Sequence, residues 1–214
     1  MIDGYAYARL LRPLWRHRVR RGGLVLLLGR LLLSRLTPGT ALSSWWPKAF
    51  ARYLLGLDPG KLQPFAEEAA RVVAAEVRPE MREAIAAERA RGAEIWLVSA
   101  TVDLLADAVT TAFGFDACVA TRLAMAHGRY DGNLDGPVCR SGEKLRRVRA
   151  RLGELGLDAD WPACSYYADG YEDLPLLEAV GHPVAVRPDE RLFAVATARG
   201  YRVVGPARGH RAGG

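Results

Sequence analysis

The pattern of apolar and polar positions divides the chain into two parts of different character. Residues 5–91 are rich in Ala, Leu, Arg and Glu and show no alternation typical of a strand, which predicts an almost entirely helical segment. From Glu94 onwards, short apolar runs alternate with stretches of helical spacing. The predicted strands cover residues 95–98, 116–120, 164–168, 183–186 and 201–204, and the predicted helices cover residues 102–113, 141–155, 174–180 and 189–199.

This alternation predicts an α/β fold built on a Rossmann-like parallel sheet, because strands joined through helices by short links pair in parallel. A hairpin is predicted at residues 123–134, with His127-Gly128 and Asp131-Gly132 as turn signals. In parallel sheets, ligands bind beyond the carboxyl ends of the strands. Ser99 and Asp169 each stand where a predicted strand stops, so this edge is where chemistry is expected.

Composition narrows the class of protein. Half of the 214 residues are apolar and a quarter are charged, which indicates one globular domain with room for a smaller module. The three cysteines form no CxxC pair, so neither a zinc site nor a disulfide framework is expected, and a cytoplasmic location is favoured. The net charge of +6 comes from arginines spread along the chain without interleaved aromatics, and no nucleic-acid partner is predicted.

The N-terminal part has one unusual stretch, in which a basic run at residues 9–21 precedes an apolar run at residues 24–36. Gly29 and Arg30 interrupt the apolar run, and a membrane-spanning helix needs roughly 20 apolar residues. A buried helix is therefore the first interpretation. Weak contact of residues 9–36 with a membrane surface is the alternative that stays open.

Three polar points could carry chemistry. Ser99 precedes a predicted helix, whose first amides favour anions, although serine is also a common helix cap. Lys144 lies in the first turn of a basic helix, where a solvated lysine is the alternative. Asp169 and Asp173 lie four residues apart in a glycine-containing loop after a strand, a pattern that suits Mg²⁺ or, alternatively, an ordinary helix start.

The order of these points resembles the second, third and fourth motifs of the haloacid dehalogenase superfamily. The sequence around and between these motifs resembles the phosphoserine-phosphatase-like branch, subclass IB. The segments that carry this resemblance include GAEIWLVSATVDLLADAV, FDACVATRL and YYADGYEDLPLLEAVGHPVAV. The resemblance extends from about residue 54 to residue 204. It implies a helical cap region at residues 1–90, a core at residues 91–205 and a disordered tail at residues 206–214.

The resemblance also implies an enzyme, a Mg²⁺-dependent phosphatase that hydrolyses a small phosphorylated metabolite. In that interpretation, Ser99 binds the phosphoryl group and Lys144 neutralises its charge. Asp169 is the metal ligand, and Asp173 orients Lys144 or a metal-bound water. Such roles agree with the physics of phosphoryl transfer, which depends on positioning and charge neutralisation.

Two features depart from the family pattern. Gly170 stands where the family usually has Ser, and the DxDGT motif, with its aspartate nucleophile and its central strand, has no counterpart in the chain. We expect an N-terminally truncated form whose written start is internal. The alternative is a catalytically inactive pseudo-phosphatase that binds a phosphorylated ligand or partner. A hydrolase with Ser99 as nucleophile is disfavoured, because no GxSxG turn is present.

Overall fold

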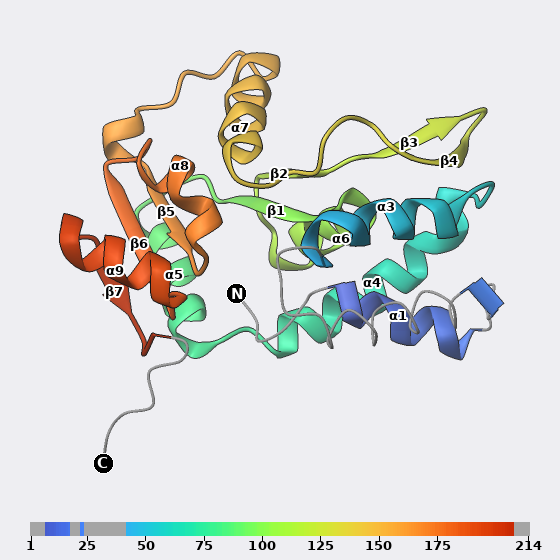
Figure 1. The fold of residues 1–214 in the computed structure, drawn as a ribbon, viewed down its shortest axis with the longest axis horizontal. Helices are drawn as coiled ribbons and strands as arrows, with labels where there is room; N and C mark the ends of the chain where they lie inside the picture. Colours follow the sequence, from blue (N-terminus) through green and yellow to red (C-terminus); the bar gives the residue numbers. More distant parts are fainter. Residues whose placement is uncertain (1–6, 18–21, 24–41, 208–214) are drawn as a thin grey trace. The chain divides into compact units, whose positions relative to one another are not determined.

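The computed structural model describes residues 7–17, 22–23 and 42–207, and the chain divides into two compact units, residues 1–139 and 140–214 (Figure 1). In the first unit, the described part of the N-terminal segment is helical, as predicted. Its helices are α1 (Tyr7–Arg16), α3 (Leu42–Leu54), α4 (Pro59–Ala75) and α5 (Pro79–Ala90).

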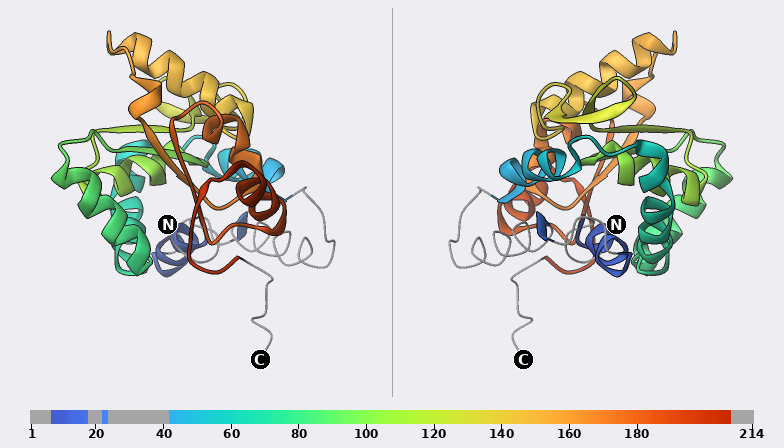
Figure 2. Two further views of the ribbon diagram at one scale, coloured as in Figure 1. Left: turned by 90° about the vertical axis from the view of Figure 1, so that its left-hand side faces the viewer. Right: turned by 90° about the vertical axis from the view of Figure 1, so that its right-hand side faces the viewer.

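Local sequence explains where these helices begin. The Asp58 side chain accepts a hydrogen bond from the Gly60 N–H at 2.8 Å, and Pro59 takes the first helical position of α4, where a missing N–H does no harm. Pro79 begins α5 in the same way. Figure 2 shows α1 lying along α4, and an ion pair of 2.6 Å between Arg9 and Glu76 joins the two segments.

A parallel βαβ unit follows, formed by β1 (Trp96–Val102), α6 (Asp103–Phe113) and β2 (Ala117–Thr121). Gly114 ends α6 in the left-handed conformation, with a φ of 61°. The position predicted for Ser99 is wrong, because β1 continues past it to Val102. The sheet register shifts between Val98 and Val102, so the chain bulges at Ser99 without leaving the strand.

The predicted hairpin is present, with β3 (Leu123–Ala126) paired antiparallel to β4 (Arg129–Leu134). His127 and Gly128 both have positive φ, 50° and 72°, and form the turn. The second turn signal was misread, because Gly132 lies inside β4. A Cβ atom at Gly132 would come within 3.2 Å of the Leu55 side chain, so the glycine lets the strand approach the end of α3 closely.

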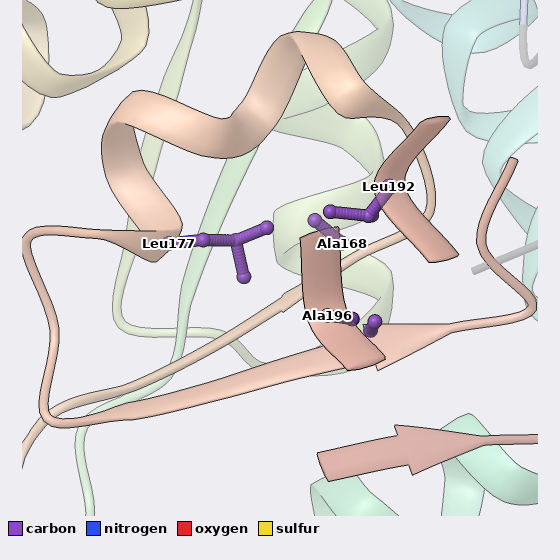
Figure 3. Packing of buried hydrophobic residues seen from close by; sticks show 5 residues of the cluster. Ala168, Leu177, Leu192 and Ala196 are labelled. Carbon is purple, nitrogen blue, oxygen red and sulfur yellow. The ribbon is translucent and has the colours of Figure 1, made fainter. Parts of the chain in front are cut away.

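The second unit holds a parallel sheet in the order β5 (Ser165–Ala168), β6 (His182–Val186), β7 (Arg202–Val204). Its helices are α7 (Gly142–Glu154), α8 (Leu174–Leu177) and α9 (Glu190–Arg199), with short 3₁₀ turns η1 (Trp161–Ala163) and η2 (Tyr171–Asp173). Small and branched apolar side chains from β5, α8, β6 and α9 form the buried core of this unit (Figure 3): Ala168, Leu177, Ala185, Leu192 and Ala196.

The predicted α/β class with parallel strands is confirmed, although the strands of the described residues are hydrogen-bonded into separate sheets. The compact units divide after Cys139, whereas the predicted cap and core boundary at residue 91 follows family architecture and stays a prediction. None of the described helices is both long and apolar enough to cross a membrane. Most of residues 9–36, and the tail from residue 208, lie outside the described residues.

Candidate functional site

Lys144 and Asp173 form a nearly buried ion pair in the second unit. Lys144 lies in the first turn of α7, and its Nζ atom is 2.5 Å from Oδ1 of Asp173. The two side chains are only 10% and 13% exposed. The Tyr166 hydroxyl on β5 lies 3.4 Å from the same Nζ atom. The structure therefore brings together two of the predicted site residues, which lie far apart in the sequence.

The surroundings of Lys144 keep it protonated. Burial by itself lowers the pKa of the ammonium group, but Tyr166 and Asp173 more than offset this effect, and the pKa lies above its usual value. Opposite charges attract more strongly when water is excluded. The pair is therefore a fixed cation held by a carboxylate at the carboxyl end of β5.

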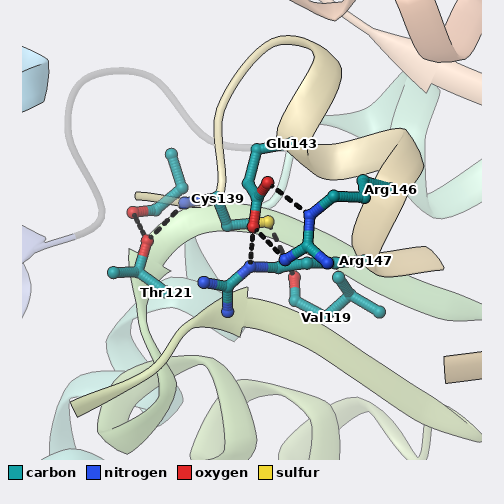
Figure 4. A network of polar contacts seen from close by, with 7 residues as sticks. Val119, Thr121, Cys139, Glu143, Arg146 and Arg147 are labelled. Carbon is teal, nitrogen blue, oxygen red and sulfur yellow. Dashed lines mark hydrogen bonds and ion pairs between the residues drawn. The ribbon is translucent and has the colours of Figure 1, made fainter. Parts of the chain in front are cut away.

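The neighbouring residue on α7 carries charge of the other sign and has its own partners. Figure 4 shows the Glu143 carboxylate accepting hydrogen bonds from Arg146 and Arg147, at distances of 2.6 to 2.7 Å. The hydrogen bond from Arg146 is the main cause that lowers the pKa of Glu143 to about 2. Adjacent side chains of a helix point about 100° apart, so Glu143 contacts the arginines while Lys144 contacts Asp173.

A second carboxylate, which the sequence did not reveal, supports the loop that holds Asp173. The Asp189 side chain accepts hydrogen bonds from the N–H groups of Tyr171 at 2.9 Å and Leu192 at 2.8 Å, so it caps α9 and fixes η2 at once. Its own N–H donates to the Asp169 carbonyl at 2.9 Å. From the sequence, only a cap of the helix that begins at Asp189 could be expected. The hydrogen bond from Tyr171 forms only in the folded loop.

Asp169 follows β5 directly and is the predicted metal ligand. Its carboxylate is the hard oxygen donor that Mg²⁺ prefers, and Mg²⁺ typically takes one or two protein carboxylates. Asp173 is already paired with Lys144. Among the described residues, no group of three or more His, Cys, Asp or Glu side chains is arranged to hold a metal ion. Asp169 thus fits one ligand position, and the magnesium site stays a prediction.

Ser99 belongs to the first unit, whereas Lys144, Asp169 and Asp173 belong to the second, so their convergence around one phosphate stays a prediction. The Ser99 Oγ atom accepts a hydrogen bond from the Thr101 N–H at 3.2 Å, which stabilises the bulge of β1 locally. Ser99 does not lie at a helix N-terminus as predicted, because α6 begins only at Asp103.

The first unit also contains a buried polar cluster that the sequence did not indicate. Asp103 accepts hydrogen bonds from the Leu104 and Leu123 N–H groups at 2.9 and 3.1 Å, yet burial raises its pKa to about 6. Burial also raises the pKa of Asp107, one turn further along α6, and that of Tyr130 to about 12. The sequence feature that could have indicated this cluster is the spacing of Asp103 and Asp107, because residues four apart on a helix are neighbours.

Comparison with known proteins identifies the family of the chain. The haloacid dehalogenase-like hydrolase family matches residues 6–178. A phosphoserine phosphatase of Mycobacterium tuberculosis is 32% identical over 112 residues, which are 52% of this chain and 36% of that protein. A histidinol-phosphatase of Neisseria meningitidis is 32% identical over 130 residues, which are 60% of this chain and 59% of that protein.

A crystal structure of a Bordetella pertussis protein of unknown function superimposes with a TM-score of 0.75 at 28% identity, over 94% of this chain and 90% of that one. The chain thus belongs to the haloacid dehalogenase-like hydrolase family, and the predicted resemblance is confirmed. The matched segment spans little more than a third of the mycobacterial relative.

Proposed function

We propose that the protein is a Mg²⁺-dependent hydrolase of small phosphomonoesters. The observation that carries this proposal is the Lys144–Asp173 pair, a buried and oriented cation at the carboxyl end of β5. Family membership supports a hydrolase. The names of the relatives, a phosphoserine phosphatase and a histidinol-phosphatase, support phosphate esters as the substrate class.

Each residue has a role that phosphoryl transfer requires. Lys144 neutralises the charge that spreads over the phosphoryl oxygens, and Asp173 keeps the ammonium group in place. Ser99 donates a hydrogen bond to the same group. Asp169 would hold Mg²⁺, which when bound supplies further charge neutralisation. Catalysis here consists mainly of holding charges in fixed positions before the reaction begins.

The first unit also contains a pocket with basic side chains. It has a volume of about 540 Å³ and lies between α3 and β4, where Trp45, Lys48 and Arg52 follow one face of the helix. Neither Lys48 nor Arg52 is paired with a carboxylate among the described residues. Two cations beside an indole ring suit an acidic and partly apolar ligand.

A pseudo-phosphatase that binds phosphate without turnover is the second candidate. It rests on residues 1–214 alone, which contain no DxDGT segment. The two candidates share the phosphate-binding residues and differ in the nucleophile, which splits hydrolysis into two steps through an aspartyl-phosphate. Binding alone therefore does not separate them, and turnover must be measured.

The test compares the 214-residue chain with the protein encoded by the complete reading frame that contains it. Both are assayed on an aryl phosphate with Mg²⁺, and both are titrated with inorganic phosphate in a calorimeter. We expect Lys144→Met to reduce phosphate binding and any turnover by about 100-fold, the scale of losing one oriented charge contact. Lys61→Met, at an exposed site on α4, is the matched control and should change neither.

The outcomes separate the candidates. Turnover by either protein that depends on Lys144 supports the hydrolase. Phosphate binding by both without turnover by either supports the pseudo-phosphatase. Phosphate binding that is absent from both proteins, or unchanged in Lys144→Met, contradicts both candidates.

A further inference from the structure

The bulge that carries Ser99 leaves backbone groups in need of partners. The β1–β2 ladder runs regularly to the pair Val98–Val119 and resumes at Val102–Thr121. Residues 99–101 of β1 therefore stand opposite a single residue of β2. Residues that leave a ladder in this way lose regular pairing, and buried backbone groups without partners destabilise a fold.

Thr121, the last residue of β2, supplies one of those partners. Its side chain is entirely buried, and its hydroxyl donates a hydrogen bond to the Ala100 carbonyl at 2.8 Å. The same oxygen accepts a hydrogen bond from the N–H of Cys139 at 3.0 Å (Figure 4). One hydroxyl group thus joins Ala100, which lies 21 positions before Thr121, to Cys139, which lies 18 positions after it.

The segment that Thr121 holds is the end of the first unit. Cys139 is itself fully buried, and its Sγ atom lies 3.9 Å from the Val119 carbonyl. The chain then continues through Ser141, which has a positive φ of 52°, into the first turn of α7 and Lys144. The contacts of Cys139 thus tie the end of the first unit to β2.

We infer that Thr121 is a positioning residue of the phosphate-binding site, holding the Ser99 bulge in shape through one hydroxyl group that the Cys139 N–H orients. This inference rests on the proposed function, in which Ser99 contacts the phosphoryl group. Thr121 acts through the Ser99 bulge and does not touch the ligand. A threonine that merely fills the core would affect stability but would not be coupled to Ser99.

The experiment measures the affinity for inorganic phosphate, in the presence of Mg²⁺, by calorimetry. Thr121→Val keeps the shape of the side chain and removes the hydroxyl, so the Ala100 carbonyl and the Cys139 N–H lose their partner. Unpaired buried groups shift their surroundings, and we expect affinity to fall at least about tenfold. Thr121→Ser retains the hydroxyl and should bind within about twofold of the wild type.

A matched control and a double-mutant cycle separate positioning from general stability. Thr110 on α6 also has a buried hydroxyl oxygen, which lies beside the Cys118 thiol and not at the bulge, so Thr110→Val should leave phosphate affinity unchanged. In a Ser99→Ala background, Thr121→Val should weaken phosphate binding by less than about twofold, because its route to the ligand is gone.

Several results would overturn the inference. Wild-type affinity in Thr121→Val would do so, as would an equal loss with and without Ser99. If Thr121→Val does not fold by circular dichroism, Thr121→Cys decides, since its thiol is a weak hydrogen-bonding group; affinity equal to the wild type would then refute the inference. Absence of phosphate binding in the wild type would contradict the proposed function as well, and so is distinguishable from failure of the positioning role alone.

Discussion

Replacing Asp173 by Asn tests how strongly the buried ion pair contributes to the fold. The substitution keeps the shape of the side chain and removes its charge, so the Lys144 ammonium group remains buried beside a neutral amide. The two side chains are 10% and 13% exposed and 2.5 Å apart, so little water is available to replace the lost partner. Breaking a buried pair in this way costs about 3–5 kcal/mol, and with the small residual exposure we expect about 3 kcal/mol.

The assay is urea denaturation at pH 7 followed by circular dichroism, with a chelator present so that bound metal does not contribute. The double variant Lys144→Met with Asp173→Asn removes the stranded charge and should be more stable than Asp173→Asn alone. Glu154→Gln is the control in the same helix. Its pair with Arg151 spans 3.0 Å, with side chains 37% and 54% exposed, and should contribute less than about 0.5 kcal/mol.

The reasoning would be refuted if Asp173→Asn lost less than about 1 kcal/mol, the range of exposed pairs. Additive effects of Lys144→Met and Asp173→Asn would refute it as well. Either result would mean that the two groups are solvated independently, and the account of Lys144 as a cation held by its carboxylate would fail.

Two further predictions concern the two units separately. Burial raises the pKa of Asp103 from 3.8 to about 6. Between these pH values the folded state therefore holds a proton that the unfolded state has lost. The stability that this proton contributes is fully present below pH 3.8 and is lost as the pH rises to 6. Asp103→Asn should therefore remove about 3 kcal/mol of pH dependence from the unfolding free energy across this range, measured by urea titrations at several pH values, and unchanged pH dependence would contradict the assignment. A Cβ atom at Gly181 would lie 1.9 Å from the Pro162 carbonyl oxygen, so Gly181→Ala should lower stability by at least about 2 kcal/mol. Gly153→Ala, in the open on α7, should instead raise stability by about 0.5 kcal/mol, and equal effects of the two changes would be inconsistent with the steric argument.

Local signals predicted most of the elements, because their causes are local. Pro79 begins a helix through its own fixed φ, and His127-Gly128 makes a hairpin turn through two positive φ angles. The failures have longer-range causes. Gly132 resembles a turn residue in sequence and has a positive φ of 86°, but it lies inside β4, where the Leu55 side chain comes close to it. The predicted helix at residues 174–180 follows the 3₁₀ turn η2 and extends only over Leu174–Leu177.

The candidate site shows the same difference between local and long-range causes. Its candidate residues were predicted from sequence because motif order places Ser99, Lys144, Asp169 and Asp173 beside predicted strands and helices. The residues that hold the site in shape were not found. Thr121 bonds to two segments that lie 21 and 18 positions away, and nothing in its own neighbourhood marks it. Partners at such distances become visible only in the folded chain.

The charges at the start of α7 explain why the site suits anions whichever candidate function holds. Glu143 is satisfied within the helix by Arg146 and Arg147, so it does not compete for the lysine beside it. Lys144 is paired with Asp173, and its raised pKa means that the ammonium group keeps its proton at neutral pH. An enzyme and a pseudo-phosphatase both require this fixed cation to bind phosphate. They diverge only where a carboxylate attacks phosphorus, so measured turnover, and not affinity, decides between them.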